Sequence, residues 1–218
     1  MLVSMFYALM TSLMKGVLLG FCRWKVEGGK RVPASGPVIV VSNHLSMIDP
    51  PTLAASLPRR VVFMAKEELF RSKWGWSYRS YGAFPVRRGE PDRKALHHAD
   101  TTLKQGLALG MFPEGKRSAS AQMSSASVGA SLIALRSGAM ILPVAITGTE
   151  KFKGLGVILS RPRITVRIGE PFFLPSTGGR PTKASLSEAT DTMMKRVAEL
   201  LPESYRGAYG NGLAQAIS

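Results

Sequence analysis

The chain has 218 residues, of which 45% are hydrophobic and 20% charged. This composition is typical of a globular domain and excludes a wholly disordered chain or a collagen-like repeat. Its 29 Lys and Arg residues against 14 Asp and Glu residues give a formal net charge of +15. So large an excess predicts an anionic partner, whether nucleic acid, membrane surface or phosphorylated ligand. The single cysteine, Cys22, excludes an internal disulfide framework and a cysteine-based zinc site.

The first 22 residues form an apolar segment that we expect to be a helix lying at a membrane surface. It has no acidic residue and one basic residue, Lys15. The apolar run before Lys15 is shorter than the roughly 20 residues that a span requires. On a helix, the segment has a wide apolar face and a thin polar stripe, a pattern typical of the headgroup boundary. The stripe consists of Ser4, Ala8, Thr11, Ser12 and Lys15, and the apolar face of Leu2, Phe6, Leu9, Leu13, Val17 and Leu18.

Two alternatives compete with an interfacial helix. One is a helix that packs on the protein's own core. The other, a cleaved signal peptide, is disfavoured because no charged residue precedes the apolar run.

Basic residues follow the segment and can meet anionic lipid, each contributing about 1 kcal/mol near such a surface. They are Arg23, Lys25, Lys30 and Arg31.

Strand and helix patterns alternate through the rest of the chain. Apolar runs predict buried strands at 38–42, 60–64, 107–112 and 140–146. Helical patterns lie between them at about 50–57, 92–105 and 125–137. This alternation predicts an α/β domain with a mostly parallel central sheet flanked by helices.

The C-terminal part of the chain predicts one further strand and one further helix. Residues 164–168 alternate apolar and basic or polar side chains, which indicates a half-exposed strand with a basic face. After a Pro- and Gly-rich loop at 171–181, a capping box at 185–188 starts a helix that ends near Pro202. The predicted organisation is an interfacial segment at 1–26, the α/β domain at 27–202 and a loose tail at 203–218.

The motif NHLSMIDP follows the first buried strand. Ligand sites in open α/β sheets lie beyond the carboxyl ends of the strands, so His44 is placed to act as a general base. Asp49 can orient the imidazole and raise its basicity where the loop enters a helix. Asp49 before Pro50 also fits an N-cap followed by proline at the first helical position. Both roles of Asp49 can coexist.

Two loops at other strand ends carry cations. Arg87 and Arg88 lie between glycines and can hold a phosphate, although taken alone they also fit a solvated charge pair. The sequence FPEGKRS at 112–118 crowds an acid and two cations around Gly115, whose flexibility lets backbone N–H groups approach an anion. Taken alone, this loop equally fits a surface turn.

Pro143 interrupts the strand predicted at 140–146. Proline cannot donate to a sheet ladder, so we expect this position at a sheet edge or a bulge. The irregularity can shape a pocket, or it can be an irregular strand alone.

Together, the four segments resemble the glycerolipid acyltransferase family, close to bacterial 1-acyl-sn-glycerol-3-phosphate acyltransferases. NHLSMID resembles the family's His-x-x-x-x-Asp block, GAFPVRRG its Arg-containing block, FPEGKRS its third block and ILPVAI its fourth. The resemblance covers about residues 23–168, and Arg88 best matches the arginine of the second block. Two departures concern the acceptor: Lys116 replaces the usual threonine, and Ser127-Val128-Gly129 stands where the family often has lysine.

The resemblance implies transfer of a fatty acyl group from acyl-CoA or acyl carrier protein to the sn-2 hydroxyl of lysophosphatidic acid, giving phosphatidic acid. It implies that His44 removes the hydroxyl proton and that Asp49 orients His44. The acceptor-phosphate pocket is then formed by Arg88, Glu114, Gly115, Lys116 and Arg117. No acyl-enzyme, metal or cofactor is expected, and the sequence has no Gly-x-Ser-x-Gly nucleophile motif.

The expected setting is the cytoplasmic face of the cell membrane, with the anionic bilayer as partner. One alternative is a relative that acylates glycerol 3-phosphate or another lysophospholipid. Another is a non-catalytic peripheral protein that binds anionic lipid, against which the His44 and Asp49 pair argues. Nucleic-acid binding is disfavoured, because the cations are scattered and form no recognition-helix pattern.

Overall fold

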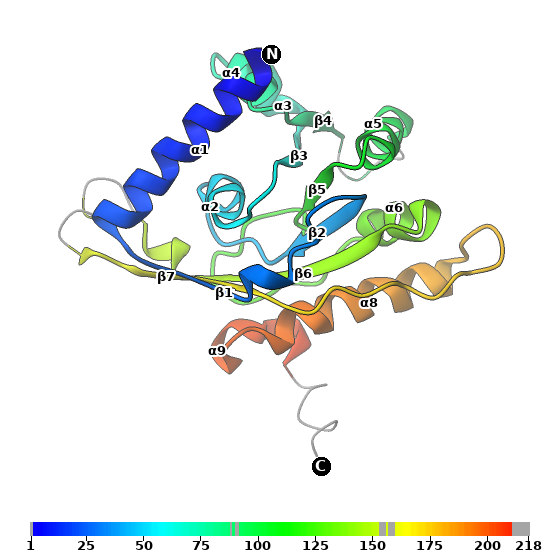
Figure 1. The fold of residues 1–218 in the computed structure, drawn as a ribbon. Helices are drawn as coiled ribbons and strands as arrows, with labels where there is room; N and C mark the ends of the chain where they lie inside the picture. Colours follow the sequence, from blue (N-terminus) through cyan, green and yellow to red (C-terminus); the bar gives the residue numbers. More distant parts are fainter. Residues whose placement is uncertain (1, 88, 90–91, 153–155, 157–159, 211–218) are drawn as a thin grey trace.

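A central β-sheet organises the molecule (Figure 1). The computed structural model describes residues 2–87, 89, 92–152, 156 and 160–210. Within these residues, seven strands form one sheet in the order β1-β7-β6-β2-β5-β3-β4. The strands are β1 (Arg23–Glu27), β2 (Val38–Ser42), β3 (Val61–Lys66), β4 (Phe84–Val86), β5 (Ala108–Met111), β6 (Met140–Thr147) and β7 (Arg163–Ile168).

The sheet is mostly parallel, as the sequence predicts. Strands β6, β2, β5, β3 and β4 are paired in parallel. Strand β7 runs antiparallel to β6, and β1 pairs in parallel with β7. The carboxyl ends of the five parallel strands therefore lie at one edge of the sheet, where open α/β sheets place their ligand sites.

Helices cover both faces of the sheet (Figure 1). On one face, Val38 and Val40 of β2 pack in a core with Tyr7 of α1 and Leu53 of α2. On the other, the alternate β2 residues pack against α5, α6 and α8. The helices are α1 (Leu2–Phe21), α2 (Asp49–Ser56), α3 (Glu67–Arg71), α4 (Gly75–Ser80), α5 (Arg93–Lys104), α6 (Gly129–Ser137), α8 (Lys183–Glu199) and α9 (Glu203–Arg206).

The predicted strands and long helices are present, but short elements are missed and some boundaries are wrong. Strand β1 lies within the region assigned to the interfacial segment, so residues 23–26 belong to the sheet. Helix α6 begins at Gly129, later than predicted, because the N–H of Ser127 donates to the Pro113 carbonyl and holds that stretch as a loop. The capping box of α8 is Thr182 with Ser185, three residues earlier than predicted.

Pro143 lies in the interior of the sheet, contrary to the expected edge or bulge. Its strand β6 is flanked by β2 and β7. The Pro143 carbonyl accepts a hydrogen bond from the Gly169 N–H, next to the Val144–Ile168 pair at the end of the β7 register. The nitrogen of Pro143 faces the same side of the strand as its carbonyl, toward the segment that follows β7. Because β7 has ended there, the missing N–H of the proline breaks no β6–β7 hydrogen bond.

The chain is folded beyond Glu203, where the sequence predicts a loose tail. Helix α9 is followed by a 3-10 turn, Gly207–Tyr209. The Tyr205 hydroxyl donates to Glu150 over 2.8 Å, and the Tyr209 hydroxyl accepts from the Ala126 N–H over 3.2 Å. These contacts tie residues 203–210 to the domain, while residues 211–218 lie outside the described residues.

Helix α1 packs on the domain with one face and leaves another face exposed. Tyr7 and Leu18 are buried, and the Tyr7 hydroxyl accepts a hydrogen bond from the Val61 N–H over 3.0 Å. Thr11, expected on the solvent-facing stripe, instead contacts the Tyr81 hydroxyl over 3.3 Å. Among the described helices, α1 alone is long and apolar enough to cross a membrane by length and composition, and the expectation that it lies at the membrane surface stays a prediction.

Asp92 caps α5 and also holds the preceding loop. Its carboxylate accepts hydrogen bonds from the N–H groups of Arg87, over 2.9 Å, and Ala95, over 3.0 Å. The hydrogen bonds from Arg87 and Ala95 lower the pKa of Asp92 below its ordinary value. A carboxyl group with a lowered pKa stabilises the fold above its unfolded-state pKa, and that stabilisation is lost as the pH falls through the folded pKa.

We predict that Asp92→Ala lowers the free energy of unfolding by about 1 kcal/mol at neutral pH, the usual value of an N-cap. The difference from the wild type should shrink as the pH falls below about 4, the ordinary pKa of aspartate, and on through the lowered pKa of the folded protein. Urea unfolding at a series of pH values measures both. Asp92→Asn, which can cap without charge, is the control, and a pH-independent difference for Asp92→Ala would contradict the assignment.

Candidate active site

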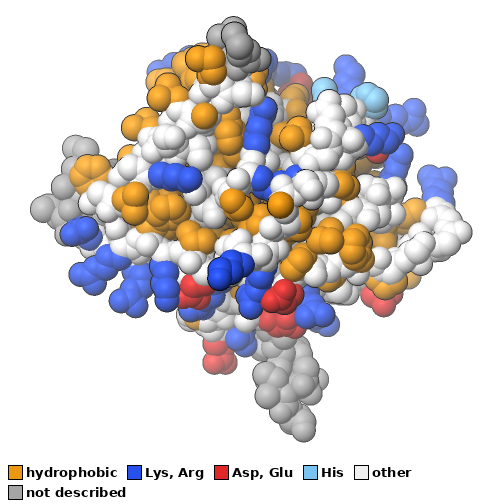
Figure 2. Space-filling view, viewed as in Figure 1, with side chains coloured by type: hydrophobic (Ala, Val, Ile, Leu, Met, Phe, Trp, Pro, Cys, Tyr) orange, Lys and Arg blue, Asp and Glu red, His pale blue; other side chains and the backbone are white. Residues whose placement is uncertain are grey.

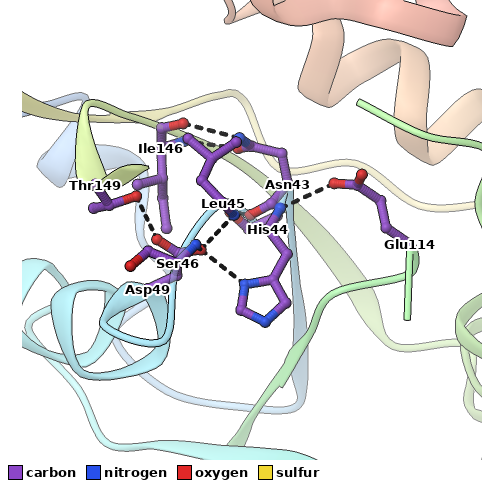
Figure 3. A network of polar contacts seen from close by, with 9 residues as sticks. Asn43, His44, Leu45, Ser46, Asp49, Glu114, Ile146 and Thr149 are labelled. Atoms are coloured by element: carbon purple, nitrogen blue, oxygen red, sulfur yellow. Dashed lines mark hydrogen bonds and ion pairs between the residues drawn. The ribbon is translucent and has the colours of Figure 1, made fainter. Parts of the chain in front are cut away.

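The loop after β2 is fixed to the neighbouring strand β6 by Asn43 (Figure 3). The buried Asn43 amide donates to the Ile146 carbonyl over 2.9 Å and accepts from the Ile146 N–H over 2.8 Å. This pairing closes the end of the sheet between β2 and β6. Because Asn43 is fixed, the backbone that leads into His44 is fixed as well.

His44 contacts Asp49 directly, as the motif predicts. Their Nδ1 and Oδ2 atoms are 2.7 Å apart, and the exposed fraction of the side chain is 13% for His44 and 0% for Asp49. A carboxylate at Nδ1 favours the tautomer with the proton on that nitrogen, which leaves a lone pair on Nε2. The arrangement is suited to general-base chemistry at Nε2.

The Asp49 carboxylate is held by the surrounding backbone and by a distant side chain (Figure 3). Its Oδ2 atom accepts from the N–H groups of Leu45, over 2.6 Å, and Ser46, over 2.7 Å. Its Oδ1 atom accepts from the Thr149 hydroxyl over 2.5 Å. These donors satisfy a buried charge that would otherwise be costly.

Asp49 is not the N-cap of α2, which corrects the alternative interpretation of the Asp-Pro sequence. It is the first residue of the helix, and Ile48 occupies the N-cap position without a side-chain cap. The carboxylate turns back toward the loop and accepts the N–H groups of Leu45 and Ser46, which precede the helix. The sequence does predict the proline at the start of the helix correctly.

The aromatic ring of Phe112 packs on one face of the His44 imidazole. The rings of His44 and Phe112 are stacked, with centroids 4.3 Å apart, and the Phe63 ring is stacked with that of Phe112, with centroids 6.2 Å apart. Phe112 follows β5, so the residue before the predicted Pro-Glu-Gly turn contributes packing to the site. Stacking on one face and the carboxylate at Nδ1 together limit how the imidazole can rotate.

Glu114 joins the FPEGKRS loop to His44. It is 6% exposed, and its Oε1 atom accepts the His44 N–H over 2.9 Å. Its Oε2 atom accepts the backbone and the hydroxyl of Ser124, over 2.8 and 2.9 Å. The Ser118 N–H donates to the His44 carbonyl over 2.8 Å. Glu114 thus positions the backbone of His44 in this structure, and its predicted part in an acceptor pocket stays a prediction.

The other predicted site residues lie on the same loop or outside the described residues. Gly115 has a φ of +68°, in the left-handed region that favours glycine, so the loop can turn there. Lys116 and Arg117 follow it and are exposed. Arg88 lies outside the described residues, and its neighbour Arg87 is exposed and donates its N–H to Asp92.

Sequence reasoning missed Asn43, Thr149 and Ser124 as parts of the site. Thr149 lies just beyond β6, so the rule that selected His44, a polar residue beyond a strand end, would also have selected it. Its partner Asp49 is 100 residues away, and no local pattern predicts that pairing. In the part of the chain that the structure describes, no group of three or more His, Cys, Asp or Glu side chains could hold a metal ion.

Known proteins resemble this chain. Residues 23–147 match the family model described as Acyltransferase. The 1-acyl-sn-glycerol-3-phosphate acyltransferase of Bacillus subtilis is 30% identical over 178 residues, covering 81% of this chain and 87% of that protein. The Streptococcus pneumoniae protein of the same name is 34% identical over 162 residues, covering 73% of this chain and 57% of that protein.

A solved structure supports the fold. It is the crystal structure of the 1-acyl-sn-glycerophosphate (LPA) acyltransferase PlsC from Thermotoga maritima, with a TM-score of 0.67 and 24% sequence identity. The match covers 97% of this chain and 80% of that chain. The family match includes His44, Asp49 and Glu114, together with the strands that position them. The chain therefore belongs to the acyltransferase family.

Proposed function

We propose that the protein transfers a fatty acyl group from acyl-CoA or acyl carrier protein to the sn-2 hydroxyl of 1-acyl-sn-glycerol 3-phosphate, giving phosphatidic acid. The observation that carries the proposal is the 2.7 Å contact between His44 and the buried Asp49 at the carboxyl ends of the parallel strands. The names of the relatives in Bacillus subtilis and Streptococcus pneumoniae support this acceptor.

In the proposed mechanism, Nε2 of His44 takes the proton of the acceptor hydroxyl as its oxygen attacks the thioester carbonyl. The carbonyl π electrons move onto the carbonyl oxygen. When this tetrahedral intermediate collapses, the carbon–sulfur bond breaks and the sulfur takes the proton from the imidazolium as the free thiol. Asp49 stabilises the imidazolium throughout, and no acyl-enzyme is formed.

The acceptor phosphate is proposed to bind on the FPEGKRS side of His44. The hydrogen bond from Ser118 to the His44 carbonyl holds this loop beside the base. The loop presents Lys116 and Arg117 to solvent, where they can attract an anionic group. Arg88 is proposed as a further phosphate ligand on the resemblance alone. Glu114 and Gly115 are proposed to shape the pocket through the backbone of the loop.

We predict that His44→Ala lowers turnover about 10²–10⁴-fold, the usual contribution of a positioned acid–base group. Mass spectrometry of the lipid products, with several lyso-acceptors and with both thioester donors, measures the reaction and identifies the acceptor. His97→Ala, which changes an exposed histidine of α5, is the matched control. Near-normal turnover of a folded His44→Ala protein would contradict the mechanism. Binding to anionic vesicles without thiol release from acyl-CoA by the wild type would indicate a non-catalytic lipid-binding protein instead.

Thr149 is proposed as a positioning residue for Asp49. Thr149→Val keeps the shape and removes the hydroxyl, so a buried carboxylate oxygen loses its donor. A hydrogen bond to a charged group contributes about 1.5–3 kcal/mol, which predicts a turnover about 10- to 100-fold lower. Thr149→Ser should restore most of the turnover.

The matched control for Thr149→Val is Thr190→Val. Thr190 is also buried, and its hydroxyl bonds to Ser131, away from His44. Thermal unfolding of both variants separates loss of stability from loss of turnover. Equal losses of turnover in the two variants would show that Thr149 acts only through overall stability.

The proposed reaction places the protein at the membrane, on the cytoplasmic side where the thioester donor is made. Acceptor and product carry acyl chains that reside in the bilayer, so the site must reach the interface. Figure 2 shows hydrophobic side chains along α1 and a group of Lys and Arg side chains at the lower left, over β1 and β7. Arg23 and Arg163 are register partners on these strands and are both exposed. Adjacent like charges favour an anionic surface.

The exposed face of α1 is proposed as the interfacial anchor. Met5, Leu9, Leu13 and Leu19 are 61%, 62%, 59% and 66% exposed. They are aligned along the helix, opposite to the face that packs on the domain through Tyr7. Such a helix can lie in the headgroup region with its apolar stripe toward the acyl chains.

We predict that the double variant Leu9→Ser, Leu13→Ser reduces co-sedimentation with anionic vesicles about tenfold or more. The reason is that it removes two leucine side chains that lipid would bury in the proposed contact. Activity on a short-chain soluble acceptor should be retained, since neither residue contributes to the core of the domain. Phe173→Ser, at a 62% exposed site, is the matched control. Unchanged vesicle binding would show that another surface anchors the protein.

A further inference from the structure

Helices α3 and α4 carry a group of exposed apolar side chains that the proposed chemistry does not use. Leu69, Trp74 and Trp76, here called the tryptophan ledge, are 36%, 59% and 56% exposed. Single exposed apolar residues are ordinary, but a group close in sequence that includes two tryptophans is typical of an interaction surface. The ledge is part of a tight turn, because a Cβ atom on Gly75 would collide with the Phe70 carbonyl oxygen.

The ledge is packed against the N-terminal half of α1. The rings of Trp76 and Phe6 meet edge to face with centroids 5.7 Å apart. The ring of Tyr81, directly after α4, lies tilted against that of Tyr7 with centroids 4.8 Å apart, and its hydroxyl contacts the Thr11 hydroxyl. Figure 1 shows α4 beside the N-terminus of α1. The contact between Trp76 and Phe6 therefore joins the ledge to α1, the helix that carries the exposed apolar stripe.

The ledge also lies at the active-site edge of the sheet. Helix α3 follows β3 without a gap, and β3 is parallel to β5, which is parallel to β2. The carboxyl ends of these strands share one edge, so α3 begins at the edge from which His44 projects. Phe63 of β3 stacks with Phe112, which in turn stacks on His44. The ledge and His44 therefore lie toward the same end of the parallel strands.

The charges around the ledge favour an anionic partner. Glu67 and Glu68 are paired with Arg71 and Lys66, over 2.9 Å each. The remaining cations pack on rings: the Lys73 ammonium lies 5.8 Å from the Trp74 ring centre, and the Arg79 guanidinium 5.6 Å from that of Phe70. Tryptophan flanked by basic residues is characteristic of the membrane–water interface.

We propose that the tryptophan ledge is a second lipid contact, which inserts Trp74 into the headgroup region of an anionic bilayer beside α1. The proposal rests on the membrane location included in the proposed function. Two contacts on one rigid body raise the overall affinity through effective concentration and fix the orientation of the body. The ledge thus turns the carboxyl edge of the sheet toward the lipid, so that an acceptor can reach His44 by lateral diffusion.

Tryptophan fluorescence tests this contact directly, because the chain has only three tryptophans. The probe protein carries Trp24→Phe and Trp76→Phe, which leaves Trp74 as the sole tryptophan. The control carries Trp→Phe at all three positions together with Phe173→Trp. Phe173 is exposed and follows the residue that bridges to Ile141, near the start of β6 and so at the opposite edge of the sheet.

Both proteins are mixed with phosphatidylcholine vesicles containing about 30% phosphatidylglycerol, an anionic surface of the cytoplasmic kind. Part of the lipid carries a doxyl quencher at a shallow acyl position. Trp74 should shift its emission to the blue and lose about half or more of its intensity, as expected for a side chain at headgroup depth. The control tryptophan should keep its emission, and circular dichroism checks that both proteins are folded.

Three outcomes would overturn the proposal. Co-sedimentation with unquenched Trp74 would mean that α1 binds lipid without the ledge. Failure of the probe protein to bind the vesicles would remove the lipid contact altogether. A blue shift without vesicles that grows with protein concentration would mean that a second copy covers the ledge. The proposed function fails separately, by absence of acyl transfer from the wild-type protein, and that result leaves the quenching readout unaffected.

Discussion

The site depends on satisfying one buried charge, the carboxylate of Asp49. Burying an unpaired carboxylate costs several kcal/mol or more, so its donors must be fixed by the fold. They come from the loop after β2, through His44, Leu45 and Ser46, and from the turn after β6, through Thr149. The orientation of the imidazole is thus one consequence of a network that also closes the end of the sheet. A change in any donor alters both the local stability and the geometry of the base.

A second buried carboxylate acts on the opposite side of His44. Glu114 holds the His44 N–H with one oxygen and Ser124 with the other, so the loop after β5 and the segment before α6 converge on the base. This convergence requires the strand order, in which β2 lies between β5 and β6 and all three run in parallel. The parallel sheet brings three strand ends to one edge, and the two carboxylates fix the loops that leave it.

The sequence predicts the features that local residue patterns determine, and it misses those that depend on residues far apart in the chain. The sequence of β2, VIVVS, predicts a strand because a short β-branched run is typical of a strand buried on both faces. All five of its residues are buried in the structure. Strand β1 was missed because it is half exposed and is held by its register with β7, about 140 residues later. Likewise, a loop that enters a helix lets His44 and Asp49 meet across their five-residue spacing, whereas nothing local pairs Asp49 with Thr149. The interior position of Pro143 depends on where β7 ends, which its own strand does not encode.

The connection between α1 and the sheet bears on how the proposed enzyme would reach an acceptor in the membrane. Only Cys22 separates α1 from β1, and Leu18 and Cys22 are buried against Ile164 of β7. At its other end, α1 is held by Tyr7 through Val61 at the start of β3. A helix fixed at both ends cannot act as a flexible tether. If its exposed stripe lies in the bilayer surface, as proposed, the end of the sheet that carries His44 has a fixed orientation relative to the membrane. The acceptor headgroup then meets the base without the acyl chain leaving the lipid, which avoids the cost of about 0.8 kcal/mol for each CH₂ group transferred to water.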